Sequence, residues 1–349
     1  MSSILALAVL LHGPAVQAQP VELTRKFSEG EKLSYFARAQ FTDEQRQGIL
    51  QTFIPHDQEI SYHYSMSVQK VKAGIAEILY QRPNMSITMG DTAESAAKTM
   101  TEKLDIKMLL GISSINKIVS QKDLNPKKDD DDDGGGLNRK VVSKVMRQGS
   151  QADQVAIGLL INYLGDIERL AFFVGPVDSG LDIAPELPID EVKVGDTWKA
   201  TVGYSPQKLK GSEGKLAVQR IDYTYTYLGP MKDSEGKDIQ RVEAKVKLDT
   251  DLTDYAQQIV GGSKASSYLK SVPLTFEGTI RFDLDPKTLH MIKAFAESKG
   301  SYSVNAKGAE QGLLEGRFHG RTTVKMDGHS MGGATTVPEK KGKGGKGGR

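Results

Sequence analysis

Hydrophobic and polar residues alternate along several stretches of the chain. The clearest is residues 60–71, where Ile60, Tyr62, Tyr64 and Met66 fall on one side and serine and histidine residues on the other. A period of two residues is typical of a β-strand with one buried face. The same pattern predicts further strands at residues 33–42, 75–88, 115–124, 198–204, 216–228, 242–248, 280–284, 289–296, 302–306 and 318–326.

Three other stretches show helical spacing. Residues 91–110 begin with an Asp and then place alanine, methionine and leucine three or four positions apart, and residues 151–173 and 251–269 follow a similar pattern. We therefore expect a mainly β (α+β) protein. Its core would be a curved antiparallel sheet, half-barrel-like in shape, with these helices packed on one face.

Short sequences recur in the same order about 160 residues apart. Residues 60–66 match 221–227, residues 123–127 match 283–287, and residues 30–33 match 195–198 more loosely. Such self-similarity indicates an internal duplication. The expected organisation is a first β-rich unit at 27–147, a helical and proline-rich connector at 148–190, and a second unit at 191–327.

Two polar segments interrupt or follow these units. Residues 129–136, five aspartates followed by three glycines, fall where the second unit has only a hairpin turn. They are expected to be an insertion at a hairpin tip, where insertions cost little. Residues 328–349 are rich in glycine and lysine and are expected to form a disordered basic tail.

The first eighteen residues are typical of an export signal. A short apolar run ends at Gly13-Pro14, and Val16-Gln-Ala18 provides small residues for cleavage. That run is too short to span a membrane, and no later stretch has eighteen consecutive apolar residues. The chain contains no cysteine, which excludes disulfides and thiolate chemistry. We expect an exported protein of the bacterial envelope, periplasmic or extracellular and not transmembrane.

The residues do not form a recognisable catalytic arrangement. Gly328-His-Ser330-Met-Gly332 matches the nucleophile elbow of α/β-hydrolases, but no Asp or His follows Ser330 in the chain. The histidines are scattered, phosphate-binding glycine loops are missing, and the adjacent aspartates lack the ligand spacing of a calcium loop. The sequence thus predicts a protein that is not an enzyme, with no catalytic residue, metal site or cofactor.

Five tyrosines are the candidate ligand-binding residues. Tyr62 and Tyr64 line one face of their strand, and Tyr223, Tyr225 and Tyr227 line one face of the matching strand. Buried, these rings would fill the core of a curved sheet. Exposed in a groove, they would present amphipathic surfaces to an apolar or glycan ligand. Both interpretations stay open at this point.

Charge adds one further candidate partner. The net charge of +2 gives no reason to expect specific nucleic-acid binding. The lysines of the C-terminal tail offer a weak, salt-sensitive contact for an anionic envelope polymer.

Some of these motifs resemble known proteins. The segment Phe27-Ser-Glu-Gly-Glu-Lys-Leu33, the run at 188–198 and the hairpin at 282–288 are similar to an exported, β-rich bacterial family of unknown function. The order of strands, helix and strands also resembles the half-barrel of periplasmic lipoprotein carriers. That resemblance implies a non-catalytic binding protein holding a lipid-like, apolar or amphiphilic ligand on a concave sheet face. The alternative is a structural or interaction protein of the envelope with a filled core and no ligand.

Overall fold

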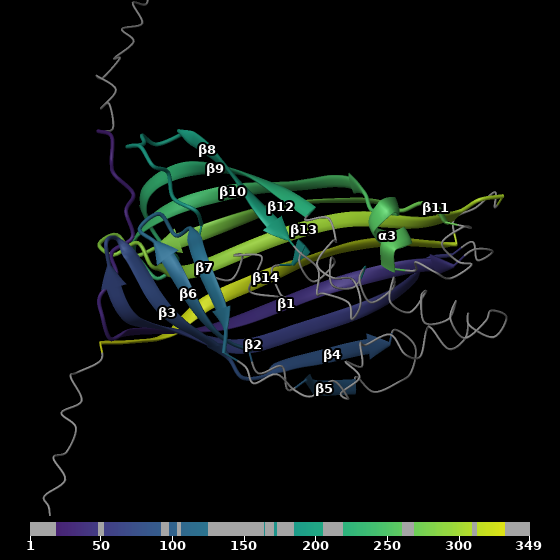
Figure 1. Cartoon of the computed structure of the whole chain (residues 1–349), viewed down its shortest axis with the longest axis horizontal. Helices are drawn as coiled ribbons and strands as arrows, with labels where there is room; N and C mark the ends of the chain where they lie inside the picture. The colour runs from purple at the N-terminus through teal and green to yellow at the C-terminus, as the bar shows by residue number, and fades with distance from the viewer. Residues whose placement is uncertain are drawn as a thin grey trace, which may run out of the picture.

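The computed structural model describes residues 19–47, 52–91, 98–102, 106–124, 164, 171–172, 185–204, 219–259, 269–308 and 313–331. Fourteen strands in these residues form one antiparallel sheet (Figure 1). The first half contributes β1 (Glu31–Gln47), β2 (Ile54–Lys72), β3 (Ile75–Arg82), β4 (Met85–Asp91), β5 (Lys98–Glu102), β6 (Ile106–Ser113) and β7 (Ile118–Asp123). The second half contributes β8 (Thr197–Tyr204), β9 (Gln219–Lys232), β10 (Asp238–Asp251), β11 (Leu269–Ser271), β12 (Pro273–Leu284), β13 (Met291–Ala306) and β14 (Leu314–Met331).

The sheet is open, and its middle is made by the two ends of the described chain. The strand order is β7-β6-β3-β2-β1-β14-β13-β12-β10-β9-β8, with β4 and β5 beside β2 and β11 beside β13. The first strand therefore pairs with the last along its whole length, from Glu31 opposite Met331 to Gln47 opposite Leu314. In Figure 1 the long strands run across the picture, and β3, β6 and β7 lie in front of them at one end.

Alternation along the strands gives the sheet one apolar and one polar face. On β1, for example, Leu33, Tyr35, Ala37 and Ala39 are buried, whereas Arg38 is exposed. The buried side chains of all the long strands belong to one hydrophobic cluster, which forms the core. Burial of this apolar area is the main force that holds the sheet together.

Glycines allow large rings to lie across neighbouring strands of the apolar face. Tyr302 is paired with Gly316, and a Cβ atom at Gly316 would lie only 2.2 Å from the Tyr302 ring. Phe318 lies in the same way over Gly300. An aromatic ring that covers the glycine of the adjacent strand permits local bending of the sheet without exposing its backbone.

Two extended segments close one end of the sheet. Val21 forms a backbone bridge with Val192, and the Leu187 N–H donates to the carbonyl of Ile115 in the β6–β7 turn. The Asn116 side chain donates to the carbonyl of Pro185. Since residues 185–192 lead into β8, these bonds connect the two outer parts of the sheet, which lie at opposite ends of the strand order.

The expected fold class is wrong in its helices. Residues 91–110, predicted as helix, contain the end of β4, all of β5 and most of β6. Their spacing suited a helix, but Met108, Leu110 and Ile112 also alternate with a period of two, and pairing with β3 selects the strand. Of residues 251–269, only α3 (Thr253–Ile259) is described as a helix. No helix of the described residues forms a layer on the sheet, so the α+β, helix-covered architecture does not hold.

The strands were predicted better than the helices. The stretches expected at 60–71, 242–248, 280–284 and 318–326 lie within β2, β10, β12 and β14. β14 continues to Met331, so the first residues of the expected tail are paired with β1. The export signal, the acidic insertion, the rest of the tail and most of the 151–173 helix lie outside the described residues.

The internal duplication remains a prediction. The tyrosine strands β2 and β9 each follow the strand with which their own half begins, β1 and β8, and pair with it. Asp123, however, ends β7 at one edge of the sheet, while Asp283 lies on the inner strand β12.

Candidate ligand-binding face

The structure buries all five candidate tyrosines on the apolar face. The exposed fractions are 2% for Tyr62, 2% for Tyr64, 1% for Tyr223, 4% for Tyr225 and 1% for Tyr227. They form two stripes, one on β2 and one on β9, separated by β1, β14, β13, β12 and β10. The sequence therefore predicted which residues share a face, and the structure shows that this face is the interior.

The stripe on β2 is extended by residues that sequence analysis did not select. Tyr64 stacks between Tyr35 of β1, at a ring-centroid distance of 4.9 Å, and Tyr80 of β3, at 5.6 Å. The Arg82 guanidinium lies over the Tyr62 ring, 4.8 Å from its centroid. Tyr35 and Tyr80 were detectable, because each occupies a buried position in an alternating strand. Arg82 was not, since an arginine at the end of a strand is usually exposed.

The stripe on β9 consists of stacked rings whose polar atoms differ in their partners. Trp198 of β8 stacks on Tyr225 at 5.4 Å, and Tyr225 on Tyr223 at 5.8 Å. The Tyr227 hydroxyl donates to Gln240 Oε1 at 2.6 Å, and Trp198 Nε1 donates to the Glu186 carbonyl at 2.8 Å. Burial raises the pKa of Tyr225, and a hydrogen bond with the Glu186 backbone opposes that rise.

Tyr223 is the exception in this stripe. Its hydroxyl is buried and has no hydrogen-bond partner in the part of the chain that the structure describes. Burial, and secondarily the neighbouring Tyr225, raise the pKa of Tyr223 well above its usual value, so the phenol keeps its proton. A protonated phenol can both donate and accept a hydrogen bond.

Small side chains lie between the two stripes. Strand registers define a row across seven strands that begins at Tyr62 and ends at Tyr227, passing through Ala37, Val324, Ala294, Phe282 and Val242. The next row runs from Ile60 to Tyr225 through Ala39, Thr322, Ala296, Ile280 and Ala244. We call the four alanines of β1 and β13 (Ala37, Ala39, Ala294 and Ala296) the alanine floor. In the first row the floor lies between the rings of Tyr62 and Phe282, and in the second between Ile60 and Ile280, with Val324 and Thr322 of β14 between its alanines.

Part of this face, including the second row of the alanine floor, is covered by the chain itself. Phe172 stacks on Phe41 at 4.5 Å and meets Phe318 edge-on at 5.8 Å. The hydroxyls of Ser298 and Thr322 donate to the carbonyls of Ala171 and Phe172. These bonds fix residues 171–172 on β13 and β14.

A broad trough of about 1440 Å³ lies on the opposite, polar face. Its lining includes Glu59, Arg321, Glu297, Lys245 and Asp222, which carry charges of both signs on neighbouring strands. The five candidate tyrosines do not contribute to it. Its ion pairs, such as Lys299 with Glu277 at 3.1 Å, are exposed and are typical of a solvated surface.

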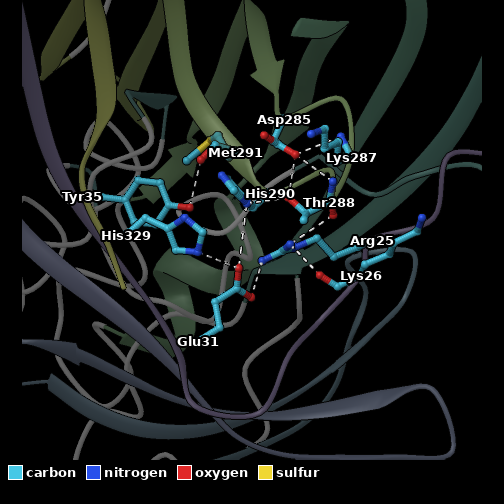
Figure 2. Close-up of polar contacts among 10 residues, drawn as sticks. All are labelled: Arg25, Lys26, Glu31, Tyr35, Asp285, Lys287, Thr288, His290, Met291 and His329. Atoms are coloured by element: carbon cyan, nitrogen blue, oxygen red, sulfur yellow. Dashed lines mark hydrogen bonds and ion pairs between the residues drawn. The ribbon is translucent and has the colours of Figure 1, made fainter. Parts of the chain in front are cut away.

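A buried polar cluster lies at the end of the sheet that residues 19–30 close (Figure 2). Arg25 Nη2 is 3.3 Å from Glu31 Oε2, and both side chains are almost completely buried. Glu31 Oε1 is 3.3 Å from His329 Nε2 and 3.9 Å from His290 Nδ1. Arg25 also donates to the carbonyls of Lys26 and Thr288. The cluster thus joins β1, β14 and the β12–β13 turn.

Within the cluster the β12–β13 turn orients His290. The Asp285 carboxylate accepts from the Thr288 hydroxyl, and Thr288 Oγ1 lies 2.7 Å from His290 Nδ1. Because the Thr288 proton is used toward Asp285, Nδ1 of His290 is the donor of the second bond. Burial and the nearby Arg25 lower the pKa of His290 to about 4, so the imidazole is neutral near pH 7. The sequence gives no local signal for this cluster, because its residues come from distant segments of the chain.

The described residues show neither a hydrolase elbow nor a metal centre. Ser330 lies inside β14, opposite Lys32, and not in a strand–helix turn. Across the described ranges no three His, Cys, Asp or Glu side chains are arranged to hold a metal ion. None of the helices in those ranges is long and apolar enough to cross a membrane.

Comparison with known proteins identifies no family. No protein-family model matches the chain, and no curated protein matches it. Among solved structures, one titled for lipid–protein interactions in lipovitellin aligns with a TM-score of 0.41 and 10% identity, covering 89% of this chain and 26% of that one. The chain thus spans about a quarter of the length of that protein.

Two further structures align less well. Salmonella typhi OmpF in complex with daunomycin has a TM-score of 0.23 and 8% identity, over 86% of this chain and 99% of the other. A putative outer membrane lipoprotein-sorting protein domain from Vibrio parahaemolyticus has a TM-score of 0.13 and 9% identity, over 87% of each chain. All three values are too low to carry an argument about function, and the resemblances noted from sequence motifs remain predictions.

Proposed function

We propose that this protein is an exported, non-catalytic binding protein that holds a lipid-like amphiphile on the apolar face of its sheet. The observation that carries the proposal is the row from Tyr62 to Tyr227, which is apolar between its two end hydroxyls and has small residues between the rings of Tyr62 and Phe282. With strands about 4.8 Å apart, this row extends roughly 29 Å along the sheet.

The chemistry of that row suits an acyl chain. An acyl chain needs a continuous apolar surface and no hydrogen-bonding group along its length. The first row of the alanine floor, with Val324 between Ala37 and Ala294, has this chemistry, and the tyrosines at the two ends of the row have polar atoms suited to the head of an amphiphile. The candidate ligand residues are therefore Tyr62, Tyr64, Tyr223, Tyr225 and Tyr227 with the four alanines between them.

One observation favours a second candidate, a structural or interaction protein of the envelope with a filled core. The five tyrosines are each no more than 4% exposed, the four alanines are buried as well, and Phe172 already bonds to Thr322 in the second row of the floor. A basic tail that contacts an anionic polymer would fit this second function as well as the first.

Replacement of Ala294 by Phe separates the two functions. In a filled core the added ring has no room, so Ala294→Phe should lower the free energy of unfolding by about 1–3 kcal/mol. On a ligand-holding surface the ring takes the place of the ligand, so the ligand-free protein keeps its stability and binding is lost. Glu297→Phe, on the polar face of the same strand, is the matched control and should change neither.

The measurements are urea unfolding of delipidated protein and native mass spectrometry of full-length protein purified from its own envelope. An added mass in the parent that disappears in Ala294→Phe but persists in Glu297→Phe supports the binding function. A parent without any added mass, together with a destabilised Ala294→Phe variant, supports the filled core.

A further inference from the structure

We infer that the Tyr223 hydroxyl is the recognition group for the polar part of the ligand, and that this part is an uncharged hydrogen-bond acceptor such as an ester carbonyl or an alcohol oxygen. The inference rests on the proposed function and adds the chemical class of the ligand. It selects neutral glycerides, esters and fatty alcohols over free fatty acids and plain hydrocarbons.

The first argument is a contrast between tyrosines of equal burial. Tyr35, Tyr223 and Tyr227 are each 1% exposed. The Tyr35 hydroxyl donates to the Met291 carbonyl at 2.9 Å, and the Tyr227 hydroxyl donates to Gln240 at 2.6 Å. Only the Tyr223 hydroxyl, of these three, has no partner among the described residues. Buried polar groups in folded proteins nearly always have a hydrogen-bond partner, so a ligand atom is the natural candidate.

The second argument concerns the cross-strand neighbours of Tyr223. Its cross-strand neighbours are Ala200 on β8 and Val246 on β10, and Gly278 of β12 follows in the same row. None of these side chains carries a polar atom that could reach the hydroxyl. Ser298 comes next in the row, and its hydroxyl already donates to the Ala171 carbonyl. A ligand group above Ala200 and beside Val246 would therefore meet Tyr223 as the hydroxyl that is still without a partner.

The third argument concerns charge. Ala200, Val246 and Gly278 carry no charge, and the neighbour that acts electrostatically on Tyr223 is Tyr225, which burial also keeps protonated. A carboxylate placed here would be buried without a cation, which is far more costly than burying a neutral carbonyl. Because the Tyr223 phenol keeps its proton, it can donate to a neutral oxygen.

Three probes with eighteen-carbon chains test the inference on the full-length, delipidated protein. Monoolein provides an ester carbonyl and hydroxyls, oleate provides a carboxylate, and 1-octadecene has no polar group. We expect the parent to bind monoolein about tenfold more tightly than oleate or 1-octadecene. This is the affinity difference that one well-made hydrogen bond provides. Tyr223→Phe should abolish this preference without changing the affinity for 1-octadecene.

Tyr35→Phe is the matched control, because it removes an equally buried hydroxyl that already donates to the Met291 carbonyl and is not among the candidate ligand residues. It should lower the urea midpoint by removing this bond, and it should keep the preference for monoolein. Tyr223→Phe should instead keep or raise the urea midpoint, because it removes a hydroxyl that has no partner in the ligand-free protein.

The possible results distinguish the inference from the proposed function. A parent that binds none of the three probes contradicts the proposed function and, with it, the inference. A parent that binds all three equally, or a Tyr223→Phe variant that keeps the tenfold preference, leaves the function standing and overturns the inference. A Tyr223→Phe variant as destabilised as Tyr35→Phe shows that the hydroxyl bonds within the protein, and this also overturns the inference.

Discussion

Two buried polar regions of this protein contrast in how completely they are paired. At the closed end of the sheet, Arg25, Glu31, Thr288 and His290 contact one another or backbone carbonyls (Figure 2). In the stripe on β9, the hydroxyl of Tyr223 is equally buried but has no partner among the described residues. A fully paired cluster holds a fold in one arrangement, whereas an unpaired group marks a place where the protein is incomplete by itself.

The two regions are also expected to differ in role, one in stability and the other in ligand binding. The closed end ties together segments that are far apart in the sequence, since Arg25 bonds to Thr288 and Glu31 lies beside His329. Its residues are therefore expected to control stability. Tyr223 is expected to control binding and to contribute little to stability. Variants in the two regions should consequently differ in which measurement they change.

The largest expected effect is the loss of Glu31. Glu31→Ala leaves the Arg25 guanidinium buried without its carboxylate, and breaking a buried ion pair in this way typically costs about 3–5 kcal/mol. Urea unfolding at pH 7 measures the change. Glu277→Ala, which removes an exposed pair with Lys299, should stay within about 0.5 kcal/mol of the parent. Equal effects of the two substitutions would show that the buried cluster does not stabilise the closed end.

The next effect is a loss of stability in mild acid through His290. Its pKa is about 4 in the folded protein against about 6.5 when unfolded, so the unfolded state binds the proton first as the pH falls. Stability is therefore complete above pH 6.5 and declines down to about pH 4, by up to about 3 kcal/mol. The groups that face His290 are Arg25, Glu31, Asp285 and His329.

A pH series of urea unfolding tests this expectation. His290→Gln should flatten the decline between pH 6.5 and 4, although acidic groups such as Asp285 contribute below that window. Backbone N–H groups of Thr288 and Lys287 hold the pKa of Asp285 below its usual value despite burial, so its contribution is lost only in stronger acid. A decline that survives in His290→Gln would assign the acid sensitivity to other residues.

A smaller effect is expected from the tyrosine hydroxyls. Tyr227→Phe removes the bond to Gln240 and should cost about 1 kcal/mol in ligand-free protein. Tyr223→Phe should be neutral or stabilising by up to about 1 kcal/mol. Thermal unfolding of the delipidated proteins measures both. The informative result is that the two substitutions change the free energy of unfolding in opposite directions. If both variants lose stability, the two hydroxyls do not differ in their pairing.

The smallest effect is expected on the polar face. Arg38 pairs with Glu59 on the neighbouring strand, with Arg38 Nη2 2.7 Å from Glu59 Oε2. Solvent screens this exposed pair, so Arg38→Gln should not move the urea midpoint measurably. A clear loss would indicate that ion pairs of the polar face stabilise the sheet as the buried cluster does.

Sequence analysis recovered the parts of the fold that have a local pattern. The alternation at 60–71 predicted β2 and the shared face of Tyr62 and Tyr64, because burial of one face imposes a period of two. It failed at 91–110, where helical spacing and strand alternation coexist and only the partner strands decide. Sequence analysis also could not predict the cluster around Glu31, because Arg25, His290 and His329 come together only through tertiary pairing.

The pairing of the first strand with the last has a consequence for folding. The hairpins β2–β3 and β9–β10 join segments adjacent in the chain, but β1 meets β14 only after every other strand has been synthesised. Non-local pairing of this kind is slow, because loop-closure entropy opposes it until the contacts form. Until then, β1 has one bare edge that offers its backbone to other chains. A chain that stops before β14 would keep that edge permanently, which makes aggregation of incomplete chains the expected failure of this topology.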